Sequence, residues 1–248
     1  MGTPLAELAG TNLGAHTATY DDTAAILYAL AVGASATDLD LVYERDLRTL
    51  PTYACALGLW AVEAAGRLGA YDPKRALHAS QRLVVHEPLP PSGDIAMTGT
   101  IGNVWDKTKA AIVEIGVSSD YFTATYNIFL PGRGGWGGDR GPSATPAEPL
   151  RPTHKSSVST SPDLAALYRL TGDRHPVHVD SAVAEANGHA GAHPADLVEL
   201  DVRLAAPVLP GDTLDITSDV ADAEVRFETS TGGTNVLAGG RARFAARD

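Results

Sequence analysis

The chain has very little cysteine, since Cys55 is the single one among 248 residues. One thiol excludes an intramolecular disulfide and any cluster of thiolate metal ligands. Long hydrophobic runs are also missing: no stretch of about 18 apolar residues is found, so no transmembrane helix is expected. The first residues lack a basic segment followed by an apolar one, and no secretory signal is predicted. These absences make a cytoplasmic location the default expectation.

Positive charge is scarce as well. The chain carries 19 Lys and Arg against 30 Asp and Glu, which gives a net charge of −11. This balance argues against nucleic-acid binding, which depends on neutralising phosphates. It does not exclude an anionic small ligand, because a local basic patch is sufficient. The hydrophobic content of 44% supports a sizeable core, and the length suits one large or two small domains.

Two helices are predicted in the first part of the chain. Residues 21–33 begin with a capping Asp-Asp-Thr, continue as an apolar run and end at a glycine. Residues 51–66 begin with a proline and are apolar almost all round, which favours a continuous helix buried on every side. Cys55, at the start of this second helix, is expected to be a core residue, since no basic partner stands beside it in sequence.

Strands are predicted from β-branched content and from the turns between them. In the first half the expected strands are 76–86, 95–105, 110–118 and 121–130, and Asp106-Lys-Thr is expected to be a hairpin turn. In the second half the expected strands are 214–221, 224–229 and 235–244. The composition changes to Gly and Pro over residues 132–155, and no Gly-Lys-Ser/Thr follows the glycines, so this segment is not a P-loop. We expect a linker there, and a ligand-binding loop stays open as the alternative.

The chain contains a faint internal repeat. The segment 82–95, Arg-Leu-Val-Val-His-Glu-Pro-Leu-Pro-Pro-Ser-Gly-Asp-Ile, is echoed by residues 203–214, Arg-Leu-Ala-Ala-Pro-Val-Leu-Pro-Gly-Asp-Thr-Leu. In each copy a strand enters a Pro/Gly turn and a second strand leaves it. The sequence therefore predicts an α+β protein of two related halves, at residues 1–131 and 156–248, joined by the linker 132–155.

One stretch concentrates chemistry: Tyr168-Arg-Leu-Thr-Gly-Asp-Arg-His-Pro-Val-His-Val-Asp, residues 168–180. An apolar, helix-like run leads into it, and Gly172 and Pro176 prevent that helix from continuing. Asp173 and His178 are five residues apart, which is off one face of a continuous helix. A bent backbone can turn both toward one point, where a carboxylate and an imidazole can hold a water molecule or a C–H proton.

This stretch resembles the hydratase 2 motif of the MaoC-like (R)-specific enoyl-thioester hydratases, which runs approximately Tyr-Arg-Leu-Ser-Gly-Asp-x-Asn-Pro-Leu-His-x-Asp-Pro. The resemblance implies a double hot dog fold, in which two curved antiparallel sheets each wrap a helix. It also implies that Asp173 and His178 activate water for addition across a 2-enoyl thioester, with Tyr168 and Gly172 at the substrate. It implies a homodimer and no cofactor, and His78 and Gln81 match a further segment of the family.

The chain departs from the family at two motif positions: His175 stands where the family has Asn, and Ser181 where it has Pro. A histidine at this position can titrate near neutrality and take a proton itself, so His175 is a third candidate catalytic residue. Asp173, His175 and His178 together also raise the alternative of a zinc or iron site. Pro176 and the family resemblance argue against a metal.

The second half is shorter than the first. Tyr28 to Gly93 spans 65 positions, whereas Tyr168 to Gly211 spans 43. The shortage falls between residues 180 and 202, where the family has a helix whose N–H stabilises the thioester oxygen, and Gly and Pro here predict a shortened helix. An N–H of Gly188 or Gly191 is the expected replacement.

Three functions remain open from the sequence. The first is a hydratase or dehydratase acting on acyl thioesters of CoA or acyl carrier protein. The second is a repurposed dehydratase-like cyclase or isomerase of a polyketide-type pathway, with the shortened helix leaving room for a bulkier substrate. The third is a non-catalytic subunit that lost the oxyanion-stabilising helix. No nucleic-acid or membrane partner is expected for any of them.

Overall fold

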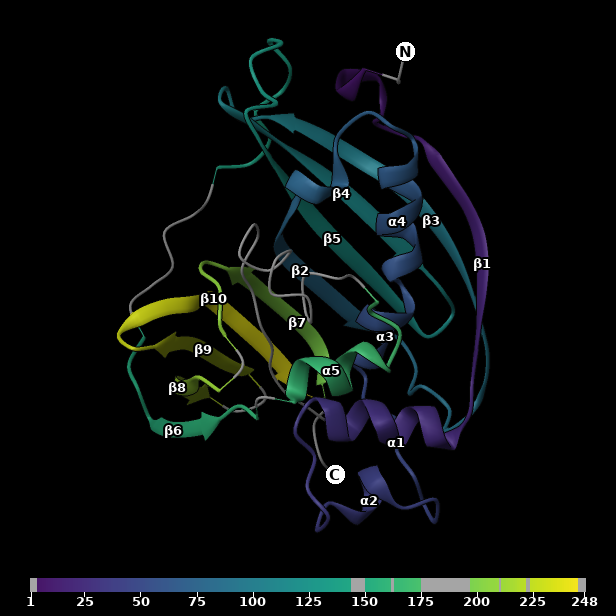
Figure 1. The fold of residues 1–248 in the computed structure, drawn as a ribbon, viewed down its shortest axis with the longest axis vertical. Coiled ribbons are helices and arrows are strands. Elements are labelled where there is room, and N and C mark those ends of the chain that lie inside the picture. The colour runs from purple at the N-terminus through teal and green to yellow at the C-terminus, as the bar shows by residue number, and fades with distance from the viewer. Residues whose placement is uncertain are drawn as a thin grey trace.

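The computed structural model describes residues 4–143, 150–161, 163–174, 197–209, 211–221 and 224–244. Ten strands form one antiparallel sheet in the order β1-β3-β4-β5-β2-β7-β10-β9-β8-β6 (Figure 1). Their bounds are β1 Asn12–Tyr20, β2 Leu77–Val85, β3 Gly93–Asp106, β4 Ala110–Ser118, β5 Phe122–Pro131, β6 His154–Ser159, β7 Leu197–Leu204, β8 Thr213–Ala221, β9 Glu224–Thr231 and β10 Thr234–Phe244.

The strand order repeats itself. Within each half the strands follow the order first, third, fourth, fifth, second, and the two second strands, β2 and β7, pair antiparallel at the centre, with Arg82 opposite Asp201. The two copies of the sequence repeat begin on these two central strands. The repeat therefore corresponds to a repeated fold, as the sequence predicted.

Helices lie mainly against the first half. Their bounds are α1 Asp22–Ala31, α2 Leu39–Val42, α3 Tyr53–Leu57, α4 Leu59–Arg67 and α5 Leu164–Arg169, with short 3-10 turns at Leu5–Glu7 and Pro73–Arg75. Figure 1 shows α4 lying along one face of the sheet half that contains β3, β4 and β5. Ala61 and Ala65 of α4 are fully buried there, because their small side chains let the helix approach the strands closely.

The predicted helix 51–66 is wrong in two respects. It is broken into α3 and α4 at Gly58, where the Tyr126 hydroxyl donates a 2.7 Å hydrogen bond to the carbonyl oxygen of Cys55. A side chain at Gly58 would collide with that hydroxyl, so the break and the glycine belong together. The helix is also not buried all round, since Glu63 and Arg67 form an ion pair with about two thirds of each side chain exposed.

The strands predicted between residues 76 and 130 are confirmed by β2 to β5, and Asp21 caps α1 as expected, by accepting from the N–H of Ala24 at 2.9 Å. The two edge strands, β1 and β6, were not predicted. Their side chains are mostly exposed, so their sequences show little alternation of apolar and polar residues. They are held by backbone pairing with β3 and β8.

The first part of the glycine-rich segment folds back on the first half. The buried carboxylate of Asp106, at the end of β3, accepts hydrogen bonds from the N–H groups of Thr108, Gly135, Gly137 and Gly138, at 2.8 to 3.3 Å. These N–H groups lower the pKa of Asp106, and Gly135 contributes most. The division of the chain at residues 131 and 156 stays a prediction.

Candidate functional site

The motif begins where α5 ends. The last turn closes with hydrogen bonds from the N–H and hydroxyl of Thr171 to the carbonyl oxygen of Tyr168, at 2.9 and 2.7 Å. Gly172 then adopts a φ of 126°, which L side chains rarely adopt, and this residue turns the chain off the helix axis. The expected break of the helix at Gly172 is confirmed. Asp173 therefore lies just beyond the helix, after a bend that requires glycine at position 172.

Asp173 acts electrostatically on Tyr168. Burial raises the pKa of the Tyr168 phenol well above its usual range, and the negative charge of Asp173 raises it further. The Tyr168 phenol is therefore neutral at neutral pH. Tyr168 can then donate its proton in a hydrogen bond without losing it.

Tyr168 packs against aromatic residues of the first half. Its ring centroid lies 6.3 Å from that of Tyr28 on α1, and Tyr28 lies 4.7 Å from Tyr53 on α3. Figure 1 shows α1 and α5 side by side. Tyr28 and Tyr168 occupy matching places, because each stands on the helix that follows the first strand of its half. We call Tyr28, Tyr53, Tyr126 and Tyr168 the tyrosine cluster.

Cys55 acts electrostatically on three members of the tyrosine cluster, Tyr28, Tyr126 and Tyr168. Burial raises the pKa of the Cys55 thiol to about 12, so the thiol is neutral at physiological pH. This agrees with the expectation that Cys55 is a core residue and not a nucleophile. Burial likewise raises the pKa of Tyr126 and Tyr28 well above the ordinary range. The cluster therefore presents aromatic rings whose hydroxyl groups are uncharged at neutral pH.

The central strand β2 supplies two polar side chains near this cluster. The ring of His78 lies 5.8 Å from that of Tyr126, and its Nε2 is 3.1 Å from the carbonyl oxygen of Ser80. Gln81 stands directly opposite Tyr126 in the strand ladder and is buried. Both residues had been singled out in the sequence by resemblance, and both lie on the strand where the two halves meet.

The candidate residues of the sequence divide into two groups. Tyr168, Gly172 and Asp173 are described, and the charge of Asp173 acts on Tyr168. The others, His175, His178, Gly188 and Gly191, lie outside the described residues, as does the stretch expected to hold a shortened helix. Their roles stay predictions.

Sequence reasoning did not assign the tyrosines of the first half to this site. Tyr28 had been interpreted as part of a packed helix only. A usable signal was present, since Tyr28 and Tyr168 stand at equivalent places of the internal repeat. Such equivalent residues meet when two halves pack around a shared axis, as these two do.

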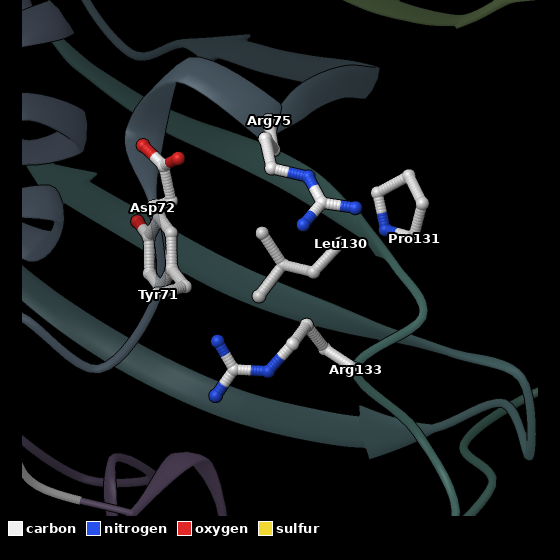
Figure 2. A pocket seen from close by; sticks show the side chains of 6 residues that line it. All are labelled: Tyr71, Asp72, Arg75, Leu130, Pro131 and Arg133. Atoms are coloured by element: carbon white, nitrogen blue, oxygen red, sulfur yellow. The ribbon is translucent and has the colours of Figure 1, made fainter.

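A separate small pocket lies elsewhere in the first half. It is lined by Tyr71, Asp72, Arg75, Leu130, Pro131 and Arg133 (Figure 2). Arg133 donates to the carbonyl oxygen of Ala70 at 2.9 Å. Leu130 is four residues along β5 from Tyr126, roughly 14 Å at the usual rise of a strand. The pocket contains none of the candidate catalytic residues.

The described residues contain neither a metal-binding cluster nor a membrane-spanning helix. No group of three His, Cys, Asp or Glu side chains that could hold a metal ion occurs in them. Within the same part of the chain, no helix is long and apolar enough to cross a membrane.

Comparison with known proteins agrees with the family that the sequence resembles. The family described as MFE-2 hydratase 2 N-terminal domain matches residues 18–129. The 3-hydroxyacyl-thioester dehydratase Y of Mycobacterium tuberculosis is 30% identical over 236 residues, which cover 79% of this chain and 80% of that protein.

Solved structures agree on the fold. A MaoC-like dehydratase from Phytophthora capsici matches with a TM-score of 0.82 at 20% identity, over 97% of both chains. A Mycobacterium tuberculosis protein described as a double hotdog fold matches with a TM-score of 0.62 at 13% identity, over 98% of this chain and 97% of that one. The expected double hot dog fold is confirmed, and the chain belongs to the MaoC-like hydratase 2 family of hydratases and dehydratases.

Proposed function

We propose that the chain catalyses the reversible addition of water to a 2-enoyl thioester, with Asp173 and His178 as the acid-base pair. The observation that carries the proposal is that Asp173 follows the bend at Gly172 directly after α5, whose Tyr168 ring packs 6.3 Å from Tyr28 of the first half. Family membership supports the same reaction, because the similar proteins are named hydratases and dehydratases.

In the proposed reaction, one member of the pair removes a proton from water as the water oxygen bonds to the β-carbon. The other member delivers a proton to the α-carbon, so one molecule of water is added in total. His175 assists the proton transfer. The thioester oxygen gains negative charge in between, and an N–H of Gly188 or Gly191 stabilises that charge. No redox cofactor is needed, since no electrons are exchanged with the substrate.

The tyrosine cluster has a physical role in this proposal. An acyl chain needs an apolar wall, and an acid-base pair needs little competing water. Tyr28, Tyr53 and Tyr126 supply such a wall from the first half, with Tyr168 and Gly172 of the second half facing the substrate. The substrate is an acyl thioester of CoA or of acyl carrier protein. A homodimer in the cytoplasm, with halves divided at residues 131 and 156, completes the proposal.

The test is direct. Purified protein is mixed with 2-enoyl-CoA thioesters of short, medium and long chain, and the absorbance of the conjugated double bond is followed. The expected result is a loss of absorbance with formation of the 3-hydroxyacyl thioester, and its reversal when that product is supplied. Folded protein that changes neither compound at any chain length would contradict the proposal.

A further inference from the structure

The side-chain oxygen of Gln81, on the inner face of the sheet, accepts no hydrogen bond from the described residues. The residue is 6% exposed, and its Oε1 is buried with no hydrogen-bond partner among the described residues. Its Nε2 donates a 3.1 Å hydrogen bond to the carbonyl oxygen of Arg82. A carbonyl can only accept, so this bond fixes which end of the amide is the donor and leaves the acceptor end unpaired.

The strand ladder shows where this acceptor lies. Gln81 is opposite Tyr126 on β5 and opposite Val202 on β7. Directly opposite residues of an antiparallel pair point to the same face, with Cβ atoms about 5 Å apart. Tyr126 is on the face covered by α3, because its hydroxyl donates to Cys55. Gln81 therefore lies at the junction of the halves, on the same face as the tyrosine cluster.

Two other buried polar atoms lack a partner among the described residues, the Nε1 of Trp60 and the hydroxyl of Tyr71. Trp60 packs against His16 on the edge strand β1, and Tyr71 lines the small pocket of Figure 2. Of these three groups, Gln81 stands directly opposite Tyr126 of the tyrosine cluster, on the strand where the two halves meet. Gln81 is therefore the candidate for a contact with the substrate.

An unpaired buried acceptor costs free energy, and a ligand that brings a donor removes this cost. The acyl chain and the thioester group of a 2-enoyl thioester have no donor. The carrier arm does, because the chain that follows the sulfur in both CoA and acyl carrier protein contains amide N–H groups. We propose that Gln81 is a substrate-contacting residue whose Oε1 accepts a hydrogen bond from the amide N–H of the carrier arm; this inference rests on the proposed function.

Two substrates test the inference. One is a 2-enoyl N-acetylcysteamine thioester, which contains the amide nearest the sulfur. The other is its acetoxyethyl analogue, in which an ester oxygen replaces the N–H. The Gln81→Met variant keeps the side-chain length and removes the acceptor. We expect it to lower kcat/KM about tenfold for the amide substrate, the effect of one lost hydrogen bond, and to leave the ester substrate unchanged.

The comparison is independent of partial misfolding, because both substrates are measured on one sample and the fraction of folded protein cancels in their ratio. Asn127→Met is the matched control, because it also removes a side-chain amide from the sheet. The amide of Asn127 lies on the outer face, where its Nδ2 donates a 3.0 Å hydrogen bond to the hydroxyl of Ser80. It should leave the ratio of the two substrates at the wild-type value.

Each outcome has a defined meaning. Equal losses on the two substrates, as expected if Gln81 holds only a water molecule, or no loss on either, would overturn the role of Gln81 while leaving the hydratase activity intact. Wild-type protein inactive on every thioester would instead remove the proposed function itself. The same variant is then assayed with CoA and carrier-protein thioesters: both should show the Gln81 penalty, and the faster one identifies the natural carrier.

Discussion

The two halves share one strand order but differ in what they bury. The first half has a large continuous core, whose fully buried members include Leu83, Ile95, Val113, Ile115 and Phe122. Among the described residues of the second half, a separate cluster contains only Val202, Val208, Leu214, Val236 and Leu237. The motif with Asp173 belongs to this second half. The fold therefore separates a well-packed support from the half that carries the candidate chemistry.

The seam between the halves is polar on its outer face. Glu199 on β7 is buried and accepts hydrogen bonds from Arg82 of β2 at 2.5 Å and from Arg243 of β10 at 2.8 Å. Arg241 is 3.6 Å away. One carboxylate thus bridges strands of both halves. The inner face of the same seam carries Gln81, opposite Tyr126 of the tyrosine cluster, and this is the face on which we propose that the substrate binds.

The contribution of each core to stability can be compared by substituting one buried valine in each half. Val113 is 0% exposed in the first half and Val236 is 1% exposed in the second. Removing two methyl groups from each leaves a cavity whose cost depends on how well the neighbours can relax. We expect Val113→Ala to lower the free energy of unfolding by about 2–3 kcal/mol and Val236→Ala by about 1 kcal/mol. Urea unfolding measures both, and equal losses would remove the distinction between the cores.

A smaller effect is expected from pH in the first half. The pKa of Asp106 is lower in the folded protein than in the unfolded chain, because Gly135 and three further N–H groups bind the charged form. Its contribution to stability is therefore present above the unfolded pKa, about 3.9, and is lost as the pH falls through the folded value.

Asp106→Asn removes this charge. Thermal unfolding of wild type and variant should differ by a constant amount above about pH 5, and the difference should shrink toward pH 3. A difference that stays constant down to pH 3 would mean that the carboxylate charge does not hold the glycine-rich segment.

Sequence reasoning predicted the parts of this fold that depend on local pattern. The β-branched content and the turns between residues 95 and 130 predicted β3 to β5, and the repeat predicted two related halves. The edge strands β1 and β6 were not predicted, because few of their side chains are buried. The break of the helix at Gly58 was not predicted, because its cause, the hydroxyl of Tyr126, is distant in sequence.

The candidate site follows the same rule. The motif identified Asp173 and Tyr168, because their spacing around Gly172 is a local property. The contact of Tyr168 with Tyr28 joins residues 140 positions apart, and only the packing of the two halves creates it. Local sequence therefore singled out candidate residues of one half but not the tyrosines of the other half that pack against them.

The central claim is that Asp173 and His178 act together on one substrate. The most direct measurement is kcat/KM for hydration by wild type, Asp173→Asn, His178→Gln and the double variant, with circular dichroism confirming that each is folded. Each single change should reduce the rate by about 100- to 10,000-fold. Because residues that act as a unit are not additive, the double variant should be no slower than the slower single variant. Losses that multiply in the double variant would contradict a shared site.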